Sequence, residues 1–293
     1  MIVETSKNTG KLPDFFIIGA AKSGTSSLFN YLSRHPEIYI PKIKEPEYFS
    51  NKSIFIRGNK WYKNIYLEAK KGQLCGDAST TYTRWPHTLD VANLISKSIP
   101  DAKFIYIMRH PVDRAYSHYA HHMRLGITML FEEALEKNNI YIDCSLYMSQ
   151  IERYLKYFER ERFLFLFQSD LWKNPRKVLG DITEFLEIKT VDLVKEGYVN
   201  KNVSGPDNFI RSKTIGKIYK IPGFRLIAKS FPEKKKDSMY RFVRHSIIGK
   251  RLEAQYQLTP MRPETRKRLL ELFEKPNREL ERFLGVKLSE WRI

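Results

Sequence analysis

The chain has 293 residues, of which 42% are hydrophobic, so it is long enough for one large α/β domain with a real core, although this length also permits two domains. Its two cysteines, Cys75 and Cys144, exclude a disulfide framework. The absence of a signal peptide and of an apolar run of about 20 residues predicts a soluble cytoplasmic protein. A formal net charge of +18 suits anionic ligands, but no nucleic-acid recognition module accompanies it.

The first predicted elements are a short buried strand over 15–19, a loop of small residues over 19–24 and an amphipathic helix over 25–34. A strand, a tight loop and a helix N-terminus make an anion site, because free backbone N–H groups point into the loop and the helix dipole favours negative charge. Lys22 adds a mobile cation. The triphosphate loop has its lysine after the second glycine, whereas Lys22 lies between Gly19 and Gly24. The segment therefore predicts a phosphate site of another kind, with an unliganded glycine- and serine-rich turn as the alternative.

A second apolar strand is predicted over 103–108, and it ends in Arg109. His110-Pro111 breaks it, and a helix follows over 112–124. Arg109 therefore lies at the carboxyl edge of a strand, where ligands collect in open α/β sheets, and Ser117 can face the same crevice. A triphosphate hydrolase needs an acidic metal ligand here, whereas the arginine fork suits a metal-free phosphate. A surface arginine paired with Asp113 is the alternative.

The remaining pattern predicts the fold class. Further strands are expected at 73–76 and 163–168, and further helices near 87–98, 131–137, 146–159 and 176–187. This alternation predicts an α/β protein, a single domain with a central parallel sheet flanked by helices on both faces and a P-loop-like nucleotide-binding architecture. The nearly continuous apolar run at 163–168 is typical of a strand that is covered on both sides. The sequence shows no internal repeat.

Together the two motifs resemble the sulfotransferases that use 3′-phosphoadenylyl sulfate. Lys22-Ser-Gly-Thr-Ser26 fits that family's 5′-phosphosulfate loop, and the run from Arg109 through Arg114 and Ser117 to Tyr119 fits its 3′-phosphate signature. The wider match over 12–49 is most similar to the branch with the heparan-sulfate sulfotransferases, and residues 258–260 and 284–291 resemble the family's closing helix and tail. The resemblance implies a bacterial-type sulfotransferase domain over residues 12–293.

The resemblance also implies the reaction and the donor site. A sulfuryl group would move from 3′-phosphoadenylyl sulfate to a hydroxyl or amine, in line and with a general base, which leaves adenosine 3′,5′-bisphosphate and requires no metal. Lys22 matches the lysine that contacts the 5′-phosphosulfate and stabilises the leaving oxygen. The residues implied to cradle the 5′ end are Ser23, Gly24, Thr25, Ser26 and Ser27. Arg109 and Ser117 are implied to hold the 3′-phosphate.

The base is implied by a third stretch, Lys44-Glu-Pro-Glu-Tyr-Phe49, because related glycan enzymes place a glutamate beside the acceptor there. Glu45 stands at that position and is the candidate general base. A surface pair of Glu45 with Lys42 or Lys44 is the structural alternative. Asp77, and more loosely His87, are the other candidate bases.

Two further features have competing interpretations. His118 and His122 are spaced i,i+4, which can bind a metal, but a packed or solvated helix face is favoured. A basic insertion over about 205–252, with its cations concentrated in 211–251, predicts a lid over the donor, a docking surface for an anionic glycan or a membrane, or a solvated basic face. In the lid interpretation, Arg211 adds a cation to the 3′-phosphate.

The sequence thus predicts a sulfotransferase whose acceptor is a sugar or glycoconjugate, without nucleic acid as a partner. A nucleotide-dependent phosphoryl transferase and a basic binding protein for an anionic polymer or membrane remain the alternatives. The acceptor, the choice between O- and N-sulfation and the oligomeric state stay open.

Overall fold

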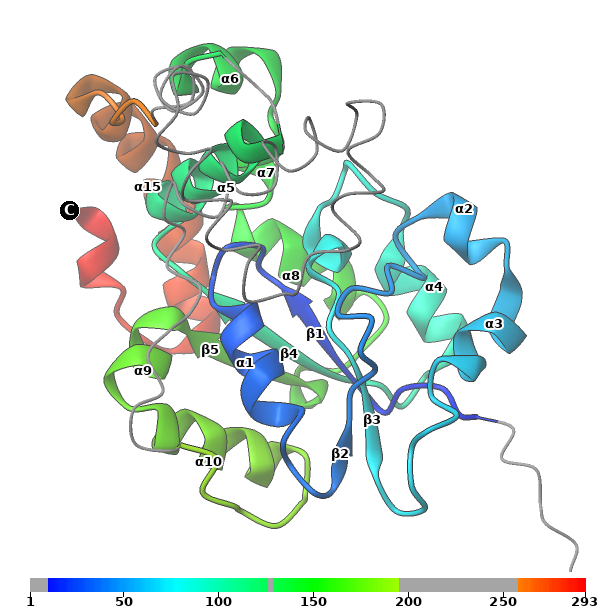
Figure 1. The fold of residues 1–293 in the computed structure, drawn as a ribbon. Helices are drawn as coiled ribbons and strands as arrows, with labels where there is room; N and C mark the ends of the chain where they lie inside the picture. The colour runs from blue at the N-terminus through cyan, green and yellow to red at the C-terminus, as the bar shows by residue number, and fades with distance from the viewer. Residues whose placement is uncertain (1–9, 126–128, 195–257) are drawn as a thin grey trace, which may run out of the picture.

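The computed structural model describes residues 10–125, 129–194 and 258–293, and a five-stranded sheet lies at its centre (Figure 1). The strands are β1 (Phe15–Gly19), β2 (Ile38–Tyr39), β3 (Leu74–Asp77), β4 (Lys103–Met108) and β5 (Phe163–Phe167). They stand in the order β2-β3-β1-β4-β5, and all neighbours pair in parallel. After β1 the chain forms the edge strand β2 and then β3 beside β1, and it next crosses to the other side of β1 to form β4 and β5. The crevice at the carboxyl ends of β1 and β4 is therefore the topological switch point, where ligands bind in such sheets.

Helices and 3₁₀ turns connect the strands. In chain order they are α1 (Thr25–Leu32), α2 (Lys52–Phe55), α3 (Gly58–Asn64), η1 (Thr80–Thr83), α4 (Val91–Ser98), α5 (Pro111–Leu125), α6 (Phe131–Lys137), α7 (Ile140–Asp143), α8 (Tyr147–Leu155), η2 (Arg160–Arg162), α9 (Gln168–Lys173), α10 (Pro175–Phe185), α15 (Pro263–Leu284) and η3 (Ser289–Arg292). Helices α1, α9 and α10 cover one face of the sheet, while α3, α4, α8 and the end of α15 pack on the other.

The two cores follow from the alternation of side chains along each strand. In β1, Phe15 and Ile17 point to the face that α1 and α10 cover, whereas Phe16 and Ile18 point to the opposite face. All four side chains are at most 2% exposed. Burying each such side chain contributes about 1.5–3 kcal/mol. Apolar residues on both faces of β1 thus require the doubly covered sheet that positions the loops at its carboxyl edge.

A third apolar cluster joins α5, α6 and α7 to the C-terminal helix α15. Leu269 and Phe273 of α15 are buried in it, and Leu280, two turns later, reaches the core of the sheet. Arg266 of α15 also donates to Asp113 of α5 at 2.9 Å. The end of the chain therefore holds α5 in place against the sheet.

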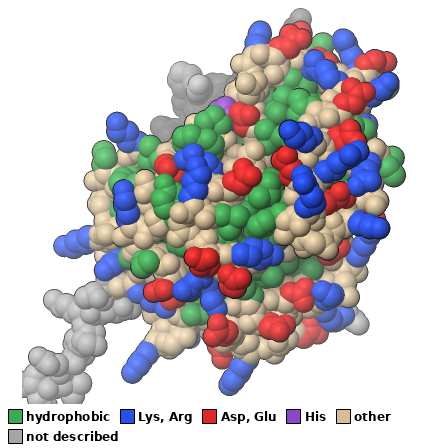
Figure 2. Space-filling view, turned by 180° about the vertical axis from the view of Figure 1, so that it is seen from behind, with side chains coloured by type: hydrophobic (Ala, Val, Ile, Leu, Met, Phe, Trp, Pro, Cys, Tyr) green, Lys and Arg blue, Asp and Glu red, His purple; other side chains and the backbone are tan. Residues whose placement is uncertain are grey.

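The α/β class, the parallel sheet and helices on both faces are confirmed. Three details differ from the sequence prediction. The pair Ile38–Tyr39 forms an edge strand too short to give an alternating pattern, the segment 52–64 is helical, and Gln168 opens α9 instead of closing β5. The predicted lid and Arg211 lie outside the described residues. On the face opposite the view of Figure 1, acidic and basic side chains of the described residues are interspersed (Figure 2), so these residues form no continuous basic surface on that side.

Candidate active site

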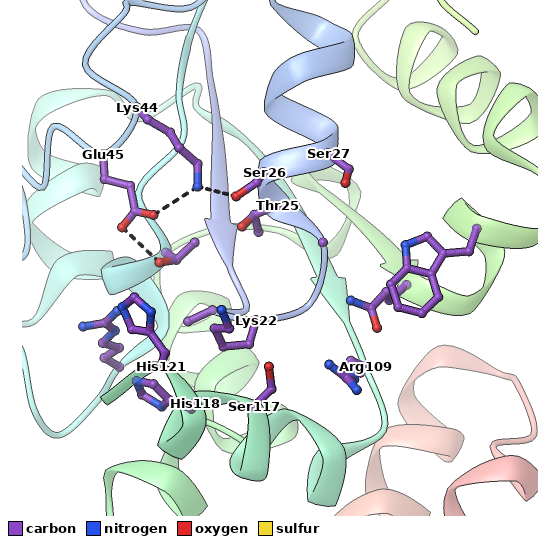
Figure 3. Close-up of a pocket in the computed structure, with 16 residues that line it drawn as sticks. Lys22, Thr25, Ser26, Ser27, Lys44, Glu45, Arg109, Ser117, His118 and His121 are labelled. Atoms are coloured by element: carbon purple, nitrogen blue, oxygen red, sulfur yellow. Dashed lines mark hydrogen bonds and ion pairs between the residues drawn. The ribbon is translucent and has the colours of Figure 1, made fainter. Parts of the chain in front are cut away.

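The loop between β1 and α1 presents a cation and a helix N-terminus to the same space. Gly24 caps α1 with φ 99°, a left-handed conformation that glycine adopts without steric cost. The first turn of α1 carries no acidic residue and Gly24 gives no side-chain cap. The N–H groups of Ser27 and Leu28 donate to the Gly24 carbonyl, so those of Thr25 and Ser26 are the ones placed to bind an anion. Lys22 has φ 73°, also left-handed, and its side chain points into the cavity below the loop (Figure 3).

Arg109 and Ser117 reach this space from the end of β4 and from α5. The Tyr147 hydroxyl donates to the Arg109 carbonyl at 2.6 Å, which fixes the backbone where the strand ends. Burial lowers the pKa of Arg109, although a guanidinium remains charged at neutral pH. Asp113 bonds to Arg266. No hydrogen bond links the guanidinium of Arg109 to another described residue, so the interpretation of Arg109 as a paired surface arginine is not supported.

One cavity of about 450 Å³ joins these groups. It is lined by Ala21, Lys22, Gly24, Thr25, Ser26, Ser27, Lys44, Glu45, Thr80, Arg84, Arg109, Ser117, His118, His121, Gln168 and Trp172. The order of the strands explains which residues line each end of the cavity. Thr80 and Arg84 follow β3 on one side of β1, whereas Arg109, Gln168 and Trp172 follow β4 and β5 on the other. Figure 3 shows Glu45 and Arg109 at opposite ends, with Lys22 between them.

Glu45 faces the cavity from the segment after β2. Its carboxylate accepts a hydrogen bond from Thr80 Oγ1 at 3.1 Å and lies 3.6 Å from Lys44 Nζ. Lys44 also donates to Ser26 Oγ at 2.5 Å, so it bridges the carboxylate and the first turn of α1. The expected surface pair with Lys44 therefore exists, but it lies in the cavity wall.

His118, His121 and Arg84 complete the wall near Glu45. His118 is 1% exposed, and burial together with the Arg114 guanidinium moves its pKa well below the ordinary range. Its Nδ1 lies 3.4 Å from Arg114 Nη1, and the centroid of its ring lies 4.5 Å from the centroid of the His122 ring. His122 in turn uses Nδ1 to bond the Tyr141 hydroxyl at 2.8 Å.

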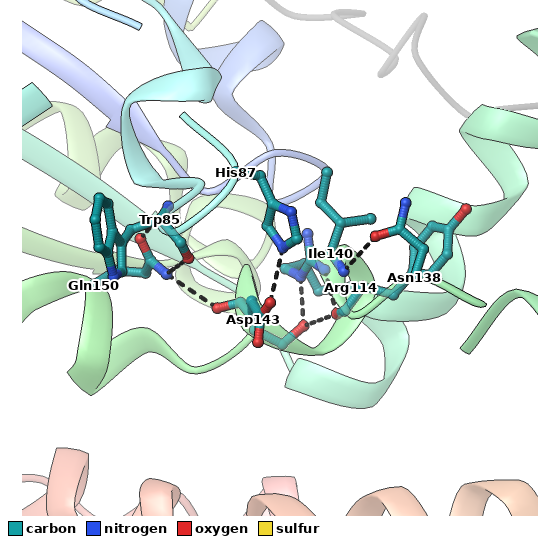
Figure 4. A network of polar contacts seen from close by, with 9 residues as sticks. Trp85, His87, Arg114, Asn138, Ile140, Asp143 and Gln150 are labelled. Atoms are coloured by element: carbon teal, nitrogen blue, oxygen red, sulfur yellow. Dashed lines mark hydrogen bonds and ion pairs between the residues drawn. The ribbon is translucent and has the colours of Figure 1, made fainter. Parts of the chain in front are cut away.

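Arg114 is completely buried beneath the cavity and is surrounded by acceptors. It donates to Ser145 Oγ at 2.6 Å and to the Tyr141 carbonyl at 2.7 Å, and Nη1 lies 3.5 Å from the carbonyl of Ala21. Arg114 therefore ties α5 to the loop before Lys22 and to the turn after α7 (Figure 4).

The polar network of Figure 4 also fixes the segment that carries Arg84. Gln150 of α8 bonds both backbone groups of Trp85 and the carbonyl of Asp143. His87 Nε2 lies 2.7 Å from Asp143 Oδ2. His87 is thus engaged in this network and is not part of the cavity wall, so its geometry does not support a role as the base.

Asp77 is not part of the cavity wall either. It is completely buried and accepts hydrogen bonds from Tyr62 at 2.6 Å, Ser79 at 2.6 Å and Tyr82 at 2.8 Å. Burial raises the pKa of Asp77 to about 6, because the three hydroxyl donors offset only part of the desolvation. Its surroundings suit a structural carboxylate behind the segment of Thr80.

The residues predicted from the motifs have different outcomes. Lys22, Gly24, Thr25, Ser26, Ser27, Glu45, Arg109 and Ser117 all line the cavity. The side chain of Ser23 is buried and lies outside the lining, and its N–H donates to the Ala20 carbonyl at 3.1 Å, so the geometry does not support the predicted contact of Ser23 with the donor. Arg211 lies outside the described residues. Eight lining residues were not among the predicted site residues, namely Ala21, Lys44, Thr80, Arg84, His118, His121, Gln168 and Trp172. Of these, Ala21, Lys44 and the two histidines lie close enough to a motif for sequence spacing to suggest them.

The sequence itself matches a known family over most of its length. A model of the sulfotransferase domain matches residues 12–250. The chain belongs to the sulfotransferase domain family. A solved sulfotransferase from Alicyclobacillus acidocaldarius has the same fold, with a TM-score of 0.67, 27% identity and coverage of 97% of this chain and 100% of that one.

Two human relatives lie in the heparan-sulfate branch. Heparan sulfate glucosamine 3-O-sulfotransferase 6 is 27% identical over 205 residues, which cover 67% of this chain and 58% of the relative. Bifunctional heparan sulfate N-deacetylase/N-sulfotransferase 3 is 28% identical over 203 residues, which cover 62% of this chain and 23% of the relative. One name specifies an O-sulfotransferase and the other an N-sulfotransferase, so similarity to both favours neither acceptor atom.

Two other kinds of feature are absent from the described residues. Within residues 10–125, 129–194 and 258–293, no three His, Cys, Asp or Glu side chains group as a metal site. The same ranges contain no helix long and apolar enough to cross a membrane.

Proposed function

We propose that this protein transfers a sulfuryl group from 3′-phosphoadenylyl sulfate to a hydroxyl or amine, in an acceptor that is a sugar or glycoconjugate. One observation carries the proposal. One cavity, at the switch point of the sheet, is lined by the loop of Lys22, the N-terminus of α1, Arg109 and Ser117. Lys22 and Arg109 meet there although three strands, β2, β3 and β4, lie between them in the sequence.

The donor fits this cavity by charge. Its 5′-phosphosulfate would lie against Lys22 and the N–H groups at the start of α1, with hydroxyls from Thr25 and Ser26 as further donors. Its 3′-phosphate would be held by Arg109 and Ser117, since a guanidinium binds two phosphate oxygens at once. Arg211 in a basic lid over 205–252 remains a prediction for the same phosphate.

The transfer step then requires only groups already in the wall. The acceptor oxygen or nitrogen forms a bond to sulfur as the bond from sulfur to the 5′-phosphate oxygen breaks. The electron pair of that bond stays on the phosphate oxygen, where Lys22 stabilises the developing charge. Glu45 takes the proton of the acceptor. Lys44 lies between Ser26 and Glu45 and adds a cation where donor and acceptor meet.

The names of the heparan-sulfate relatives support a sugar acceptor. The end of the cavity at Glu45, Thr80 and Arg84 is the part that the donor phosphates leave open in this arrangement. A sugar could present a hydroxyl or an amine to Glu45 there, so the proposal covers both kinds of sulfation.

Calorimetric titration with adenosine 3′,5′-bisphosphate in the presence of a chelator tests the donor site. We expect tight binding by the wild type and a loss of about 100-fold in Arg109→Ala, because a charge-assisted bidentate contact disappears. Arg162→Ala is the matched control, since Arg162 pairs with the exposed Asp101 and lies outside the cavity. Binding of ATP–Mg²⁺ in place of this nucleotide would reassign the protein to phosphoryl transfer. Salt-sensitive binding of an anionic polymer without any nucleotide binding would make it a binding protein.

A further inference from the structure

His118 combines a cavity position with an unpaired polar atom. It lies in the wall beside Ser117, near His121 and across from Glu45 (Figure 3). Its ring is almost completely buried, and its Nε2 atom has no hydrogen-bond partner among the described residues. Buried polar atoms in proteins normally have a partner. An unpaired one in the wall of a cavity therefore points to a ligand that supplies it.

The contact on the other side of the ring determines which nitrogen carries the proton. Arg114 Nη1 lies 3.4 Å from His118 Nδ1, and a guanidinium can only donate. Nδ1 must therefore accept, which leaves the proton of the neutral ring on Nε2. Arg114 cannot turn away from this contact, because Ser145 and the Tyr141 carbonyl hold its other nitrogens.

The charges around the ring keep it neutral. Arg114 lies beneath it, Arg84 faces it from the segment after β3, and His121 and His122 lie on its own helix. Glu45 is the acidic side chain in the same cavity wall. Burial and the neighbouring cations lower the pKa of His118 well below its ordinary value. His118 thus has a proton to donate in a hydrogen bond and no available lone pair with which to act as a base.

We propose that His118 Nε2–H donates a hydrogen bond to an oxygen of the sulfuryl group while that group passes from the donor to the acceptor. This inference rests on the proposed sulfuryl transfer. The ring neither gains nor loses a proton in the step, and the proton of the acceptor still goes to Glu45. A fixed donor in a site that excludes water stabilises charge on the transferred group without having to reorient. Arg114 is then a positioning residue that acts through the tautomer of His118.

Three variants of His118 test the donor role. A Gln side chain can place an amide N–H near the position of Nε2, whereas Asn ends near the position of Nδ1 and Ala has no donor. We follow the release of adenosine 3′,5′-bisphosphate from 3′-phosphoadenylyl sulfate, with an unsulfated amino-sugar oligosaccharide present. We expect kcat to fall about 100-fold in His118→Ala and His118→Asn, as for the loss of one transition-state donor. In His118→Gln we expect kcat to fall only about tenfold, because the amide N–H can replace the donor. The affinity for adenosine 3′,5′-bisphosphate, which lacks the sulfuryl group, should change less than about threefold.

His122→Gln is the matched control, because His122 lies one turn further along α5 and is not part of the cavity wall. Equal kcat values for the Gln and Asn variants, or a kcat for His118→Ala within about threefold of the wild type, would refute the donor role. If the wild type neither binds adenosine 3′,5′-bisphosphate nor consumes the donor, the proposed function and the role of His118 both fail. Normal binding and turnover with an unaffected His118→Ala removes this inference alone.

The tautomer has a spectroscopic test that needs no activity. The chain contains seven histidines, so ring ¹⁵N–¹H correlation spectra are tractable, and the signal missing from His118→Gln assigns His118. We expect the neutral ring with its proton on Nε2 between about pH 5.5 and 8. A proton on Nδ1, or a titration near the usual pKa of about 6.5, would overturn the assignment.

Discussion

The wall of the cavity and the polar layer behind it use the same residue types in opposite ways. Arg109 and Arg114 are five residues apart in one motif, yet the guanidinium of Arg109 faces the cavity without a hydrogen bond to another described residue, while that of Arg114 is fully buried among acceptors. A charge that faces a cavity is available to a ligand, whereas a buried charge must be satisfied by the protein. Residue type and motif position alone therefore do not separate binding residues from supporting ones.

The carboxylates repeat this contrast. Glu45 lies in the cavity wall with one hydroxyl donor and one lysine nearby, whereas Asp77 is enclosed by three hydroxyl donors. If the contrast is functional, substitutions in the wall should change turnover and leave stability nearly intact. Substitutions behind the wall should first change the free energy of unfolding.

Lys22→Ala is expected to give the largest effect in the wall. It removes the cation that we propose to stabilise the leaving phosphate oxygen, so kcat should fall about 1,000-fold while adenosine 3′,5′-bisphosphate remains bound. The free energy of unfolding should stay within about 0.5 kcal/mol of the wild type, as for other substitutions outside the core. A fully active variant in a sulfate-transfer assay would remove Lys22 from the reaction.

Arg114→Ala tests the layer behind the wall. The change leaves Ser145 Oγ and two carbonyls without their buried donor and opens a void under the loop of Lys22. We expect a loss of about 3 kcal/mol in the free energy of unfolding, measured with urea. Arg162→Ala on the exposed surface should change it by less than about 0.5 kcal/mol. Equal stability of the two variants would contradict the supporting role of Arg114.

Glu45→Gln keeps the shape of the side chain but removes the carboxylate that we propose as the base. We expect kcat to fall about 100-fold or more, with the affinity for adenosine 3′,5′-bisphosphate and the unfolding midpoint unchanged. Lys42→Gln, in the same segment but exposed and outside the cavity wall, is the matched control. Normal turnover of Glu45→Gln across the pH range would place the base elsewhere.

Local sequence patterns were sufficient to predict four of the five strands and the end of the cavity between Lys22 and Arg109. The strand–loop–helix around Lys22 and the strand that ends at Arg109 each carry their own signal, and parallel order brings their ends together. The edge strand Ile38–Tyr39 could not be predicted, because two residues give no period.

The other end of the cavity depends on long-range packing. Arg84 reaches the wall because Gln150 of α8 fixes the backbone of Trp85, and Trp172 does so because β5 lies next to β4. Neither relation appears in the local sequence. The same limit explains why Asp77 and Glu45 both looked suitable as the base, since only the fold decides which carboxylate faces the cavity.

Asp77→Asn is expected to give the smallest effect, and its signature is a change in how the free energy of unfolding depends on pH. The pKa of Asp77 is about 6 in the folded protein and 3.8 as a reference, so folding favours its protonated form. The stability that this group contributes is therefore fully present below about pH 3.8 and is lost as the pH rises through about 6. The loss amounts to roughly 2–3 kcal/mol.

The free energy of unfolding, measured with urea from pH 4 to 8, should fall by this amount more in the wild type than in Asp77→Asn. Asp101→Asn, which removes an exposed carboxylate, is the matched control. If the pH dependence of the free energy of unfolding is the same in Asp77→Asn as in the wild type, the pKa of this carboxyl group does not change on folding. If Asp77→Asn instead loses turnover while its pH-dependent stability is unchanged, Asp77 takes part in the reaction and not in the supporting layer.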